Sequence, residues 1–152
     1  MKKLLLILIN LCVILCANAQ TVTTLAGSGT ARSTNGTGTA ASFYYPSGVA
    51  VDASGNVYVA DYGSNLIRKI TSEGVVTIFA GSGMQGKTNG TGIDASFNGP
   101  IGVAVDASGN LYVADSGNNL IRKITSTGLV TTLAGSGNGG STNGTGTAAR
   151  FL

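Results

Sequence analysis

Short apolar runs separated by glycine-rich segments recur along most of the chain. A run at 48–52 leads through a turn into 56–61, and further turns lead to 66–70 and 75–80. Each run has the length of a β-strand and is bounded by Gly, Ser, Asn or Asp residues, which favour turns. The pattern predicts a series of antiparallel strands, with no helical periodicity after the N-terminal segment.

The same pattern returns with a period of 54 residues and no gaps. Residues 21–74 match 75–128 at 38 of 54 positions, and 129–152 begin a third copy. The run at 56–61 is apolar on both faces, which is typical of a sheet covered on both sides, and 48–50 are small enough for the crowded axis of a radial array. We predict an all-β fold, a β-propeller of four-stranded antiparallel blades that is incomplete in this chain, with a β-sandwich as the structural alternative.

The first 19 residues have a different character. Met1-Lys2-Lys3 is followed by an apolar run from Leu4 to Leu15 and then by Ala17-Asn18-Ala19, the order found in a signal peptide. We predict cleavage after Ala19, so that 1–19 is a signal peptide and 20–152 a partial propeller that is secreted, periplasmic or on the cell surface. Lipid attachment at Cys16 is disfavoured, because Leu15 stands where a lipoprotein signal needs a small residue.

Removal of the leader changes the charge and the available chemistry. Cys12 and Cys16 leave with it, and the chain contains no His. Loss of Lys2 and Lys3 leaves seven basic against six acidic residues, so the formal charge falls from +3 to +1. Such a balance gives no electrostatic case for nucleic acid. Ser-His-Asp and Cys-His nucleophiles and typical zinc sites are excluded, and we expect no cofactor and no membrane contact after cleavage.

Three motifs resemble functional sites but favour structural interpretations. Residues 81–88 satisfy the P-loop pattern, yet Asn89-Gly90 would break the helix that a phosphate cradle needs. Asp52-x-Ser54-x-Asn56 and its copy at 106–110 alternate oxygen donors like a calcium loop, but one carboxylate in each favours a capped hairpin turn. Arg68-Lys69 is expected to pair with nearby Asp side chains or to lie solvated between blades. Asn35, Asn89 and Asn143 stand in Asn-Gly-Thr sequons.

A family resemblance rests on two stretches of each copy. Pro46-x-Gly48 to Asp61, followed by Asn65-x-Ile67-Arg68-Lys69-Ile70, resembles the NHL-repeat signature and recurs at 100–115 and 119–124. The resemblance implies a propeller, commonly of about six blades and often extracellular in bacteria. Related propellers include lactonases and amidating lyases, but no residue here matches their metal sites.

The chain contains two such blades. Thr21–Ala26 is predicted to be a fourth strand with no blade before it, and Leu152 falls short of a third counterpart of Pro46 and Pro100. Two hypotheses follow: a fragment whose missing blades lie in the rest of a longer chain, or self-association of two-bladed chains into a lectin-like ring. The surplus fourth strand in each chain disfavours the ring.

One rim of the propeller is the predicted binding surface. Antiparallel order brings the turn between second and third strands and the long loop at 81–99 to the same rim, where most of the 16 differences between the two copies lie. Loops of this length are often functional. The candidate residues are Tyr44, Tyr45, Tyr62, Arg32, Lys87 and Asn98. We expect a non-catalytic scaffold for a protein or glycan ligand, with an oligomeric lectin and a fragment of a lactonase-like or lyase-like enzyme as alternatives.

Overall fold

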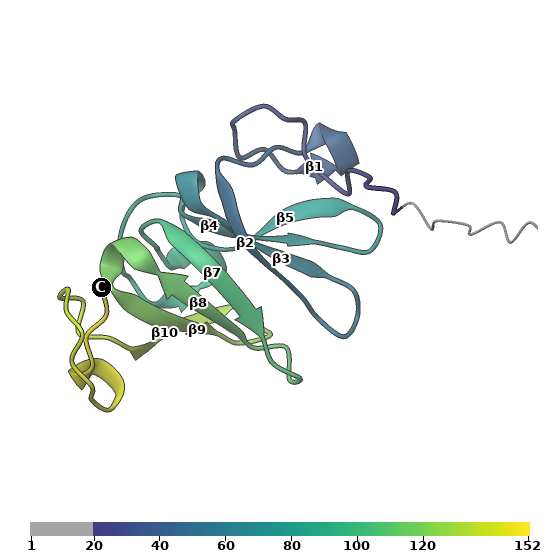
Figure 1. Ribbon diagram of the computed structural model, residues 1–152. Helices are drawn as coiled ribbons and strands as arrows, with labels where there is room; N and C mark the ends of the chain where they lie inside the picture. The colour runs from purple at the N-terminus through teal and green to yellow at the C-terminus, as the bar shows by residue number, and fades with distance from the viewer. Residues whose placement is uncertain (1–19) are drawn as a thin grey trace, which may run out of the picture.

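The computed structural model describes residues 20–152, and the predicted leader at 1–19 lies outside the described residues. The fold consists of two five-stranded antiparallel sheets that pack against each other (Figure 1). The first sheet has the order β1-β5-β4-β3-β2. Its strands are β1 (Gly36–Thr37), β2 (Pro46–Val51), β3 (Val57–Asp61), β4 (Leu66–Ile70) and β5 (Val75–Ala80).

The second sheet repeats the first, with the order β6-β10-β9-β8-β7. Its strands are β6 (Gly90–Thr91), β7 (Pro100–Val105), β8 (Leu111–Asp115), β9 (Leu120–Ile124) and β10 (Leu129–Ala134). The loops contain short 3-10 helices: η1 (Gly38–Ala40), η2 (Tyr62–Ser64), η3 (Gly92–Asp94), η4 (Ser116–Asn118) and η5 (Gly146–Ala148). None of the helical segments within 20–152 has the length and apolarity to cross a membrane.

The four main strands predicted for each copy are confirmed, and the long loop adds a fifth. Gly36 and Gly90 lie in two-residue edge strands that pair with the outer strand of their own sheet, at Val76 and Val130. The loop at 81–99 is therefore partly structured, with β6, η3 and a bridge from Gln85 to Phe97.

The prediction of a strand at Thr21–Ala26 is wrong. This segment has no strand and is exposed except at Ala26. Its counterpart β10 pairs with β9, whereas no strand within 20–152 is placed to pair with Thr21–Ala26. An apolar run of strand-like sequence remains irregular when its backbone groups have no neighbouring ladder.

The two sheets pack face to face over an apolar core. The first sheet contributes Tyr58, Ala60, Ile67 and Ala80, the second contributes Leu111, Val113, Ile124 and Val130, and the loop before β7 adds Ala95 and Phe97. The inner strands β2 and β7 lie against each other. Gly48 marks their closest approach, because a Cβ there would lie 2.6 Å from the carbonyl oxygen of Ile101. The small residues predicted for the crowded axis are therefore required at this position.

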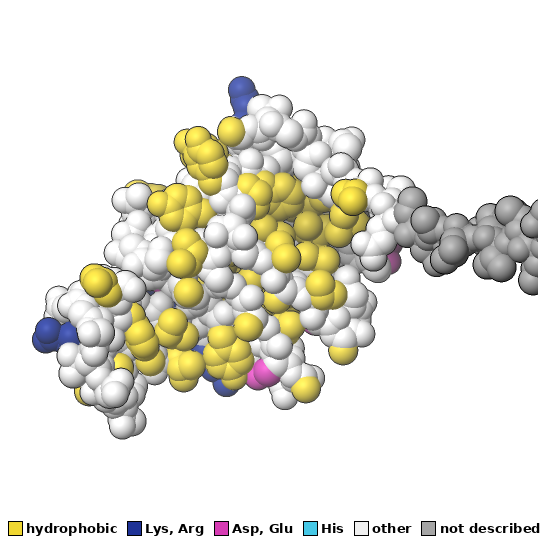
Figure 2. Space-filling view, in the orientation of Figure 1, with side chains coloured by type: hydrophobic (Ala, Val, Ile, Leu, Met, Phe, Trp, Pro, Cys, Tyr) yellow, Lys and Arg dark blue, Asp and Glu magenta, His cyan; other side chains and the backbone are white. Residues whose placement is uncertain are grey.

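The remaining face of each sheet is open. Phe43, Phe97 and Phe151 are equivalent residues, yet Phe97 is fully buried between the sheets whereas Phe151 is 36% exposed. Around Phe43, a hollow of about 270 Å³ extends over Val49, Val57, Val59 and Ile70. Figure 2 shows the apolar side chains of this hollowed face in yellow. Burial thus depends on a neighbouring sheet, as expected for stacked blades.

Candidate recognition rim

The ends of the long loop meet the β3–β4 turn at one rim, as predicted. Its middle does not: the N–H groups of Gly38 and Gly92 donate to the carbonyls of Gly74 and Gly128, both at 2.9 Å, in the turns at the opposite rim. The backbone N–H of Gly63, in η2, donates to the carbonyl of Tyr44 at 2.7 Å. The side chain of Asn65 donates to Gly83 O at 3.4 Å and accepts from the N–H of Gly99 at 2.9 Å. Asn65 has the left-handed backbone conformation (φ 56°), which this residue type tolerates. The turn of the first sheet is therefore tied to the loop that enters the second.

A buried arginine holds each loop onto its sheet. Arg68 lies fully buried in β4, and its Nη1 donates to Asp61 Oδ2 and to Ser42 O, both at 3.2 Å. Its Nη2 donates to Thr34 O at 3.2 Å and to Asn35 Oδ1 at 2.8 Å. The guanidinium also lies over the ring of Phe43, 5.3 Å from its centroid. Arg122 makes the equivalent bonds in the second sheet.

The expected pairing of these arginines with Asp is confirmed, but the sequence reasoning missed their contacts with the loops. The other expectation, solvation between blades, does not describe Arg68 or Arg122. The sequence signal that could have revealed these contacts is an Arg that recurs at the same position of both strands, on the face that it shares with the apolar residues two positions away. A buried guanidinium must have several acceptors, and loop carbonyls provide them.

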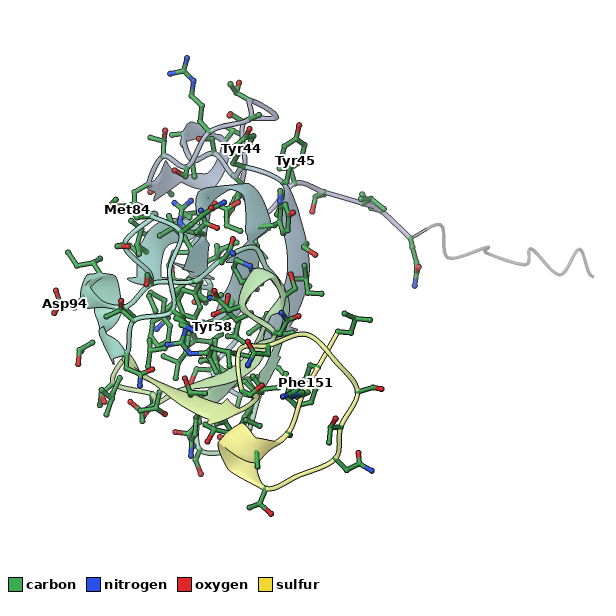
Figure 3. All side chains as sticks on the ribbon, turned by 90° about the vertical axis from the view of Figure 1, so that its left-hand side faces the viewer. Tyr44, Tyr45, Tyr58, Met84, Asp94 and Phe151 are labelled. Atoms are coloured by element: carbon green, nitrogen blue, oxygen red, sulfur yellow. The ribbon has the colours of Figure 1, made fainter. Side chains whose placement is uncertain are left out.

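The three candidate tyrosines gather at this rim. The ring centroids of Tyr44 and Tyr45 are 4.8 Å apart, and Figure 3 shows both side chains at the same end of the molecule. Tyr62 belongs to the turn that bonds to Tyr44, and its Cε2 lies 2.8 Å from the place of a Cβ on Gly99. As whole residues, Tyr44, Tyr45 and Tyr62 are 39%, 66% and 45% exposed. Tyr45 has φ 54°, a strained conformation for a bulky residue.

The other candidates lie on three different loop segments, and the N–H of Arg32 donates to the carbonyl of Phe43, beside Tyr44, at 3.2 Å. Arg32 is exposed on the first long loop. Lys87 is also exposed, and its Nζ lies 3.4 Å from the place of a Cβ on Gly137, in the third copy of the loop. The side chain of Asn98 donates to Gly117 O at 3.2 Å, and its backbone N–H donates to Asp115 Oδ1 at 2.8 Å. Asn98 therefore stabilises the rim of the second sheet.

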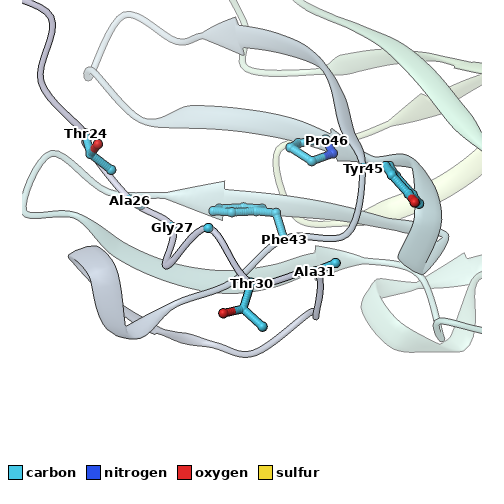
Figure 4. Close-up of a pocket in the computed structure, with 9 residues that line it drawn as sticks. Thr24, Ala26, Gly27, Thr30, Ala31, Phe43, Tyr45 and Pro46 are labelled. Atoms are coloured by element: carbon cyan, nitrogen blue, oxygen red, sulfur yellow. The ribbon is translucent and has the colours of Figure 1, made fainter.

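A second hollow lies beside Tyr45 (Figure 4), with a volume of about 460 Å³. Phe43 and Pro46 line it together with small residues from 24–31. The equivalent residues Phe97 and Pro100 are fully buried against the first sheet. We therefore interpret this hollow as a face on which sheets stack rather than as a ligand pocket, which leaves the exposed rings of the rim as the candidate surface.

The calcium-like motifs form hairpin turns, as predicted. Asp106 Oδ1 accepts the backbone N–H groups of Ser108 and Asn110, both at 2.9 Å. Its Oδ2 accepts from the Asn110 amide at 2.9 Å and from the Tyr112 hydroxyl at 3.1 Å. The hydrogen bond from Asn110 is the main cause that lowers the pKa of Asp106 to about 2, and the bond to Asp106 raises the pKa of Tyr112. Asp52 has the same bonds and a lowered pKa.

The segment with the P-loop pattern does not form a phosphate cradle. Lys87 and Thr88 are followed by the strand β6, and Thr88 N–H donates to the Ser96 hydroxyl at 2.9 Å. Among residues 20–152, no α-helix begins at this segment to supply amide donors to a phosphate.

Two twisted antiparallel sheets, stacked with their small-residue strands innermost, define the class of protein: these are blades of a β-propeller. The sequence model of the NHL repeat matches residues 43–70 and 97–124. The chain therefore carries two NHL repeats.

Known proteins agree with this assignment. NHL repeat-containing protein 2 of Gallus gallus is 39% identical over 61% of this chain, which covers 13% of that protein. The chloroplastic protein SUPPRESSOR OF QUENCHING 1 of Arabidopsis thaliana is 35% identical over 59% of the chain. The chain thus spans only a small part of the curated relatives it matches.

Solved structures show the same fold. A protein of unknown function from Bacteroides thetaiotaomicron is 33% identical, with a TM-score of 0.59 over 64% of this chain and 25% of that one. An auxiliary nutrient binding protein from the same organism has a TM-score of 0.60 over 68% of this chain and 29% of that one. Its identity of 23% makes this a likeness of fold alone.

Proposed function

We propose that this chain is a binding module in which propeller blades hold a rim that recognises a protein or glycan ligand outside the cytoplasm. The observation that carries the proposal is that Tyr44, Tyr45 and Tyr62 gather at one rim and are 39–66% exposed as residues. Tyrosine combines a large apolar ring with a hydroxyl and loses little entropy on binding, which suits it to recognition surfaces.

The frame beneath the rim supports the proposal. The loop that carries Tyr44 is bonded to Asp61, whose Oδ1 accepts the Tyr44 N–H at 2.7 Å, and to the N–H of Gly63. Rings on such a fixed backbone need less ordering when a ligand binds than rings on a loose loop. Export is part of the same proposal and rests on the sequence of residues 1–19.

A non-catalytic role is supported by the chemistry available at the rim. The residues after the predicted cleavage site include no His and no Cys. Asp52 and Asp106, whose pKa values are lowered, lie in the turns at the opposite rim and are occupied by bonds within those turns. The rim therefore has neither of the two side chains that most often serve as the base or the thiol nucleophile of an enzyme.

Binding of residues 20–152 to a glycan array and to a displayed peptide library tests the proposal. Tyr44→Ala and Tyr62→Ala are expected to weaken binding of any hit about tenfold each, a loss of about 1.4 kcal/mol. Ile93→Ala is the control, because Ile93 is an exposed hydrophobic residue in η3, and the neighbouring Gly92 N–H donates to Gly128 O at 2.9 Å, at the opposite rim. Absence of hits, or equal losses in the control, would overturn the proposal.

A further inference from the structure

The acidic side chains that reach solvent lie at the rim opposite the tyrosines. Within residues 20–152, four acidic side chains are not buried, and each stands in a turn or loop at that end of its sheet: Asp52, Glu73, Asp94 and Asp106. Figure 3 shows Asp94 away from Tyr44 and Tyr45. The other two acidic side chains are fully buried in ion pairs with Arg68 and Arg122. Among the described residues, the tyrosine rim therefore exposes no Asp or Glu side chain.

The tyrosine rim carries cations instead. Arg32 is exposed, and its backbone N–H donates to the carbonyl of Phe43, the residue before Tyr44, at 3.2 Å. Lys87 is exposed on the second loop. The carbonyl of the preceding residue, Gly86, accepts from an η4 side chain in the β8–β9 turn at 2.7 Å. One exposed cation thus stands at the rim end of each of the two loops.

Two further cations of the sheets are placed differently. Lys69 and Lys123 lie over the rings of Tyr58 and Tyr112, each 5.9 Å from the centroid. The hydroxyls of these two rings donate to the carboxylates in the β2–β3 and β7–β8 turns, at the opposite rim. Lys69 and Lys123 therefore lie toward the acidic end of the molecule, and the loop cations stand apart from any carboxylate.

The three copies of the loop place a cation at the same point with three different residues. Arg32 of the first copy is replaced by Gly86 in the second, where the next residue is Lys87. In the third copy the side chain of Arg150 takes this place, because its Cδ lies 3.3 Å from the position of a Cβ on Gly140, the equivalent of Arg32. A charge that recurs while the residue changes indicates that the charge itself is used, since a packing contact or a bidentate bond depends on one side chain.

We propose that the ligand of the tyrosine rim is an anionic polysaccharide. This inference deepens the binding role proposed above and rests on it. The carboxylate or sulfate groups of the ligand pair with the cations of successive loops. The C–H faces of its sugar rings lie on the exposed tyrosine rings, whose hydroxyls bond to sugar hydroxyls. The carboxylates at the opposite rim repel the same ligand, so the electric field of the molecule directs it to the tyrosine rim.

A peptide fits this surface less well. Peptide-recognition sites commonly use a free strand edge, a groove for a helix or an aromatic-lined groove for a proline-rich segment. The described residues of the rim belong to turns and loop ends, whose backbone groups bond to one another, as Gly63 N–H does to Tyr44 O at 2.7 Å. The cations also lie on separate loops, so the anions must be spaced along the ligand, as they are on a polymer of charged sugars.

Biolayer interferometry of the chain on four immobilised polymers tests the proposal: polygalacturonate, dextran sulfate, neutral dextran and poly-glutamate. The first two present carboxylates and sulfates, so their comparison identifies the anion. At least one of them is expected to bind about tenfold more tightly than dextran. A rise in salt from about 50 to 500 mM should weaken that binding about fivefold, because exposed charges are screened. Poly-glutamate has charges but no sugar rings, and it should bind more weakly than the acidic polysaccharide.

Variants at the rim locate the charges that bind. Arg32→Gln and Lys87→Gln remove one charge each and should weaken binding of the acidic polysaccharide about threefold, and the double variant about tenfold. Arg32→Lys should retain the parent affinity. Lys123→Gln is the matched control, because it removes the same charge from β9, and it should leave the affinity unchanged.

The outcomes separate the ligand class from the binding role. Equal binding of dextran or poly-glutamate, or an equal loss in Lys123→Gln, would overturn the anionic polysaccharide as ligand. If a neutral glycan or a peptide then bound, with a loss in Tyr44→Ala, the rim would still be the binding surface and only the ligand class would be wrong. If no polymer, glycan or peptide bound the chain, the ligand class and the proposed function would both be wrong.

Discussion

Gly48→Ala tests whether the two sheets are stacked as closely as the structure shows. A Cβ at this position would lie 2.6 Å from Ile101 O, 3.0 Å from Gly102 Cα and 3.3 Å from Val103 N. All three are backbone atoms of β7, so no side chain can move aside. Relief requires the inner strands to separate, which also loosens the apolar core between the sheets.

The expected loss follows from the cost of overpacking. Forcing a methyl group into a packed contact costs about 1–3 kcal/mol, and a contact with backbone belongs at the upper end, so we expect about 2–3 kcal/mol. Gly102→Ala is the matched control. It is the same position of the repeat, but its Cβ would meet only Ala114 Cβ at 3.6 Å, an ordinary contact. The control should change the free energy of unfolding by less than about 0.5 kcal/mol.

Urea unfolding followed by circular dichroism measures both variants. At an m-value of about 2 kcal/mol/M, Gly48→Ala should lower the midpoint by about 1 M, and Gly102→Ala should leave it nearly unchanged. Equal midpoints for the two variants would show that β2 and β7 are not in close contact in solution, and the stacking of the sheets would have to be revised.

Three further results are expected. Arg122→Ala should lower the free energy of unfolding by about 3–5 kcal/mol, because it leaves the buried Asp115 carboxylate without its cation. The control Lys123→Ala should change the free energy of unfolding by less than about 0.5 kcal/mol, and similar urea midpoints for the two variants would contradict the prediction. Asp106 has a pKa lowered from 3.8 to about 2, so its stabilising effect is present above pH 3.8 and lost as the pH falls toward 2; the stability difference between the parent chain and Asp106→Asn should shrink over that window, and a constant difference would refute the assignment. Gly99→Ala should lower the free energy of unfolding by about 1–2 kcal/mol because of the positive φ of this residue, and further because its Cβ would contact Tyr62. In a double-mutant cycle, Tyr62→Ala should recover only the loss that is due to this contact.

The blades could be predicted from the sequence because two independent signals agreed. The 54-residue repeat fixed which segments are equivalent, and the apolar runs at 66–70 and 75–80 match β4 and β5 to the residue. The first strand begins two residues earlier than predicted, at Pro46. Proline fits there, at the start of a strand on the inner edge of the sheet.

The missing predictions concern contacts that leave no periodic pattern. β1 and β6 are two-residue strands of Gly and Thr, too short for any alternation. Thr21–Ala26 has the same sequence character as β10, and only the partner strand distinguishes them. The arginine contacts join residues 33–34 positions apart, which no local pattern reveals. The Tyr44–Tyr45 pair and Tyr62 were predicted to share a rim, and their role in binding stays a prediction.

The pairing of β1 with β5 has a consequence for how such chains grow. Because Gly36 pairs with Val76 and Arg68 reaches back to Asn35, each blade closes on its own preceding loop rather than on the next blade. A gene segment that encodes 54 residues therefore encodes a blade together with the loop that pairs with its outer strand. Duplication can insert such a module anywhere in the series without breaking the internal bonds of its neighbours, and the 38 matching positions of the two copies are the record expected of such an event.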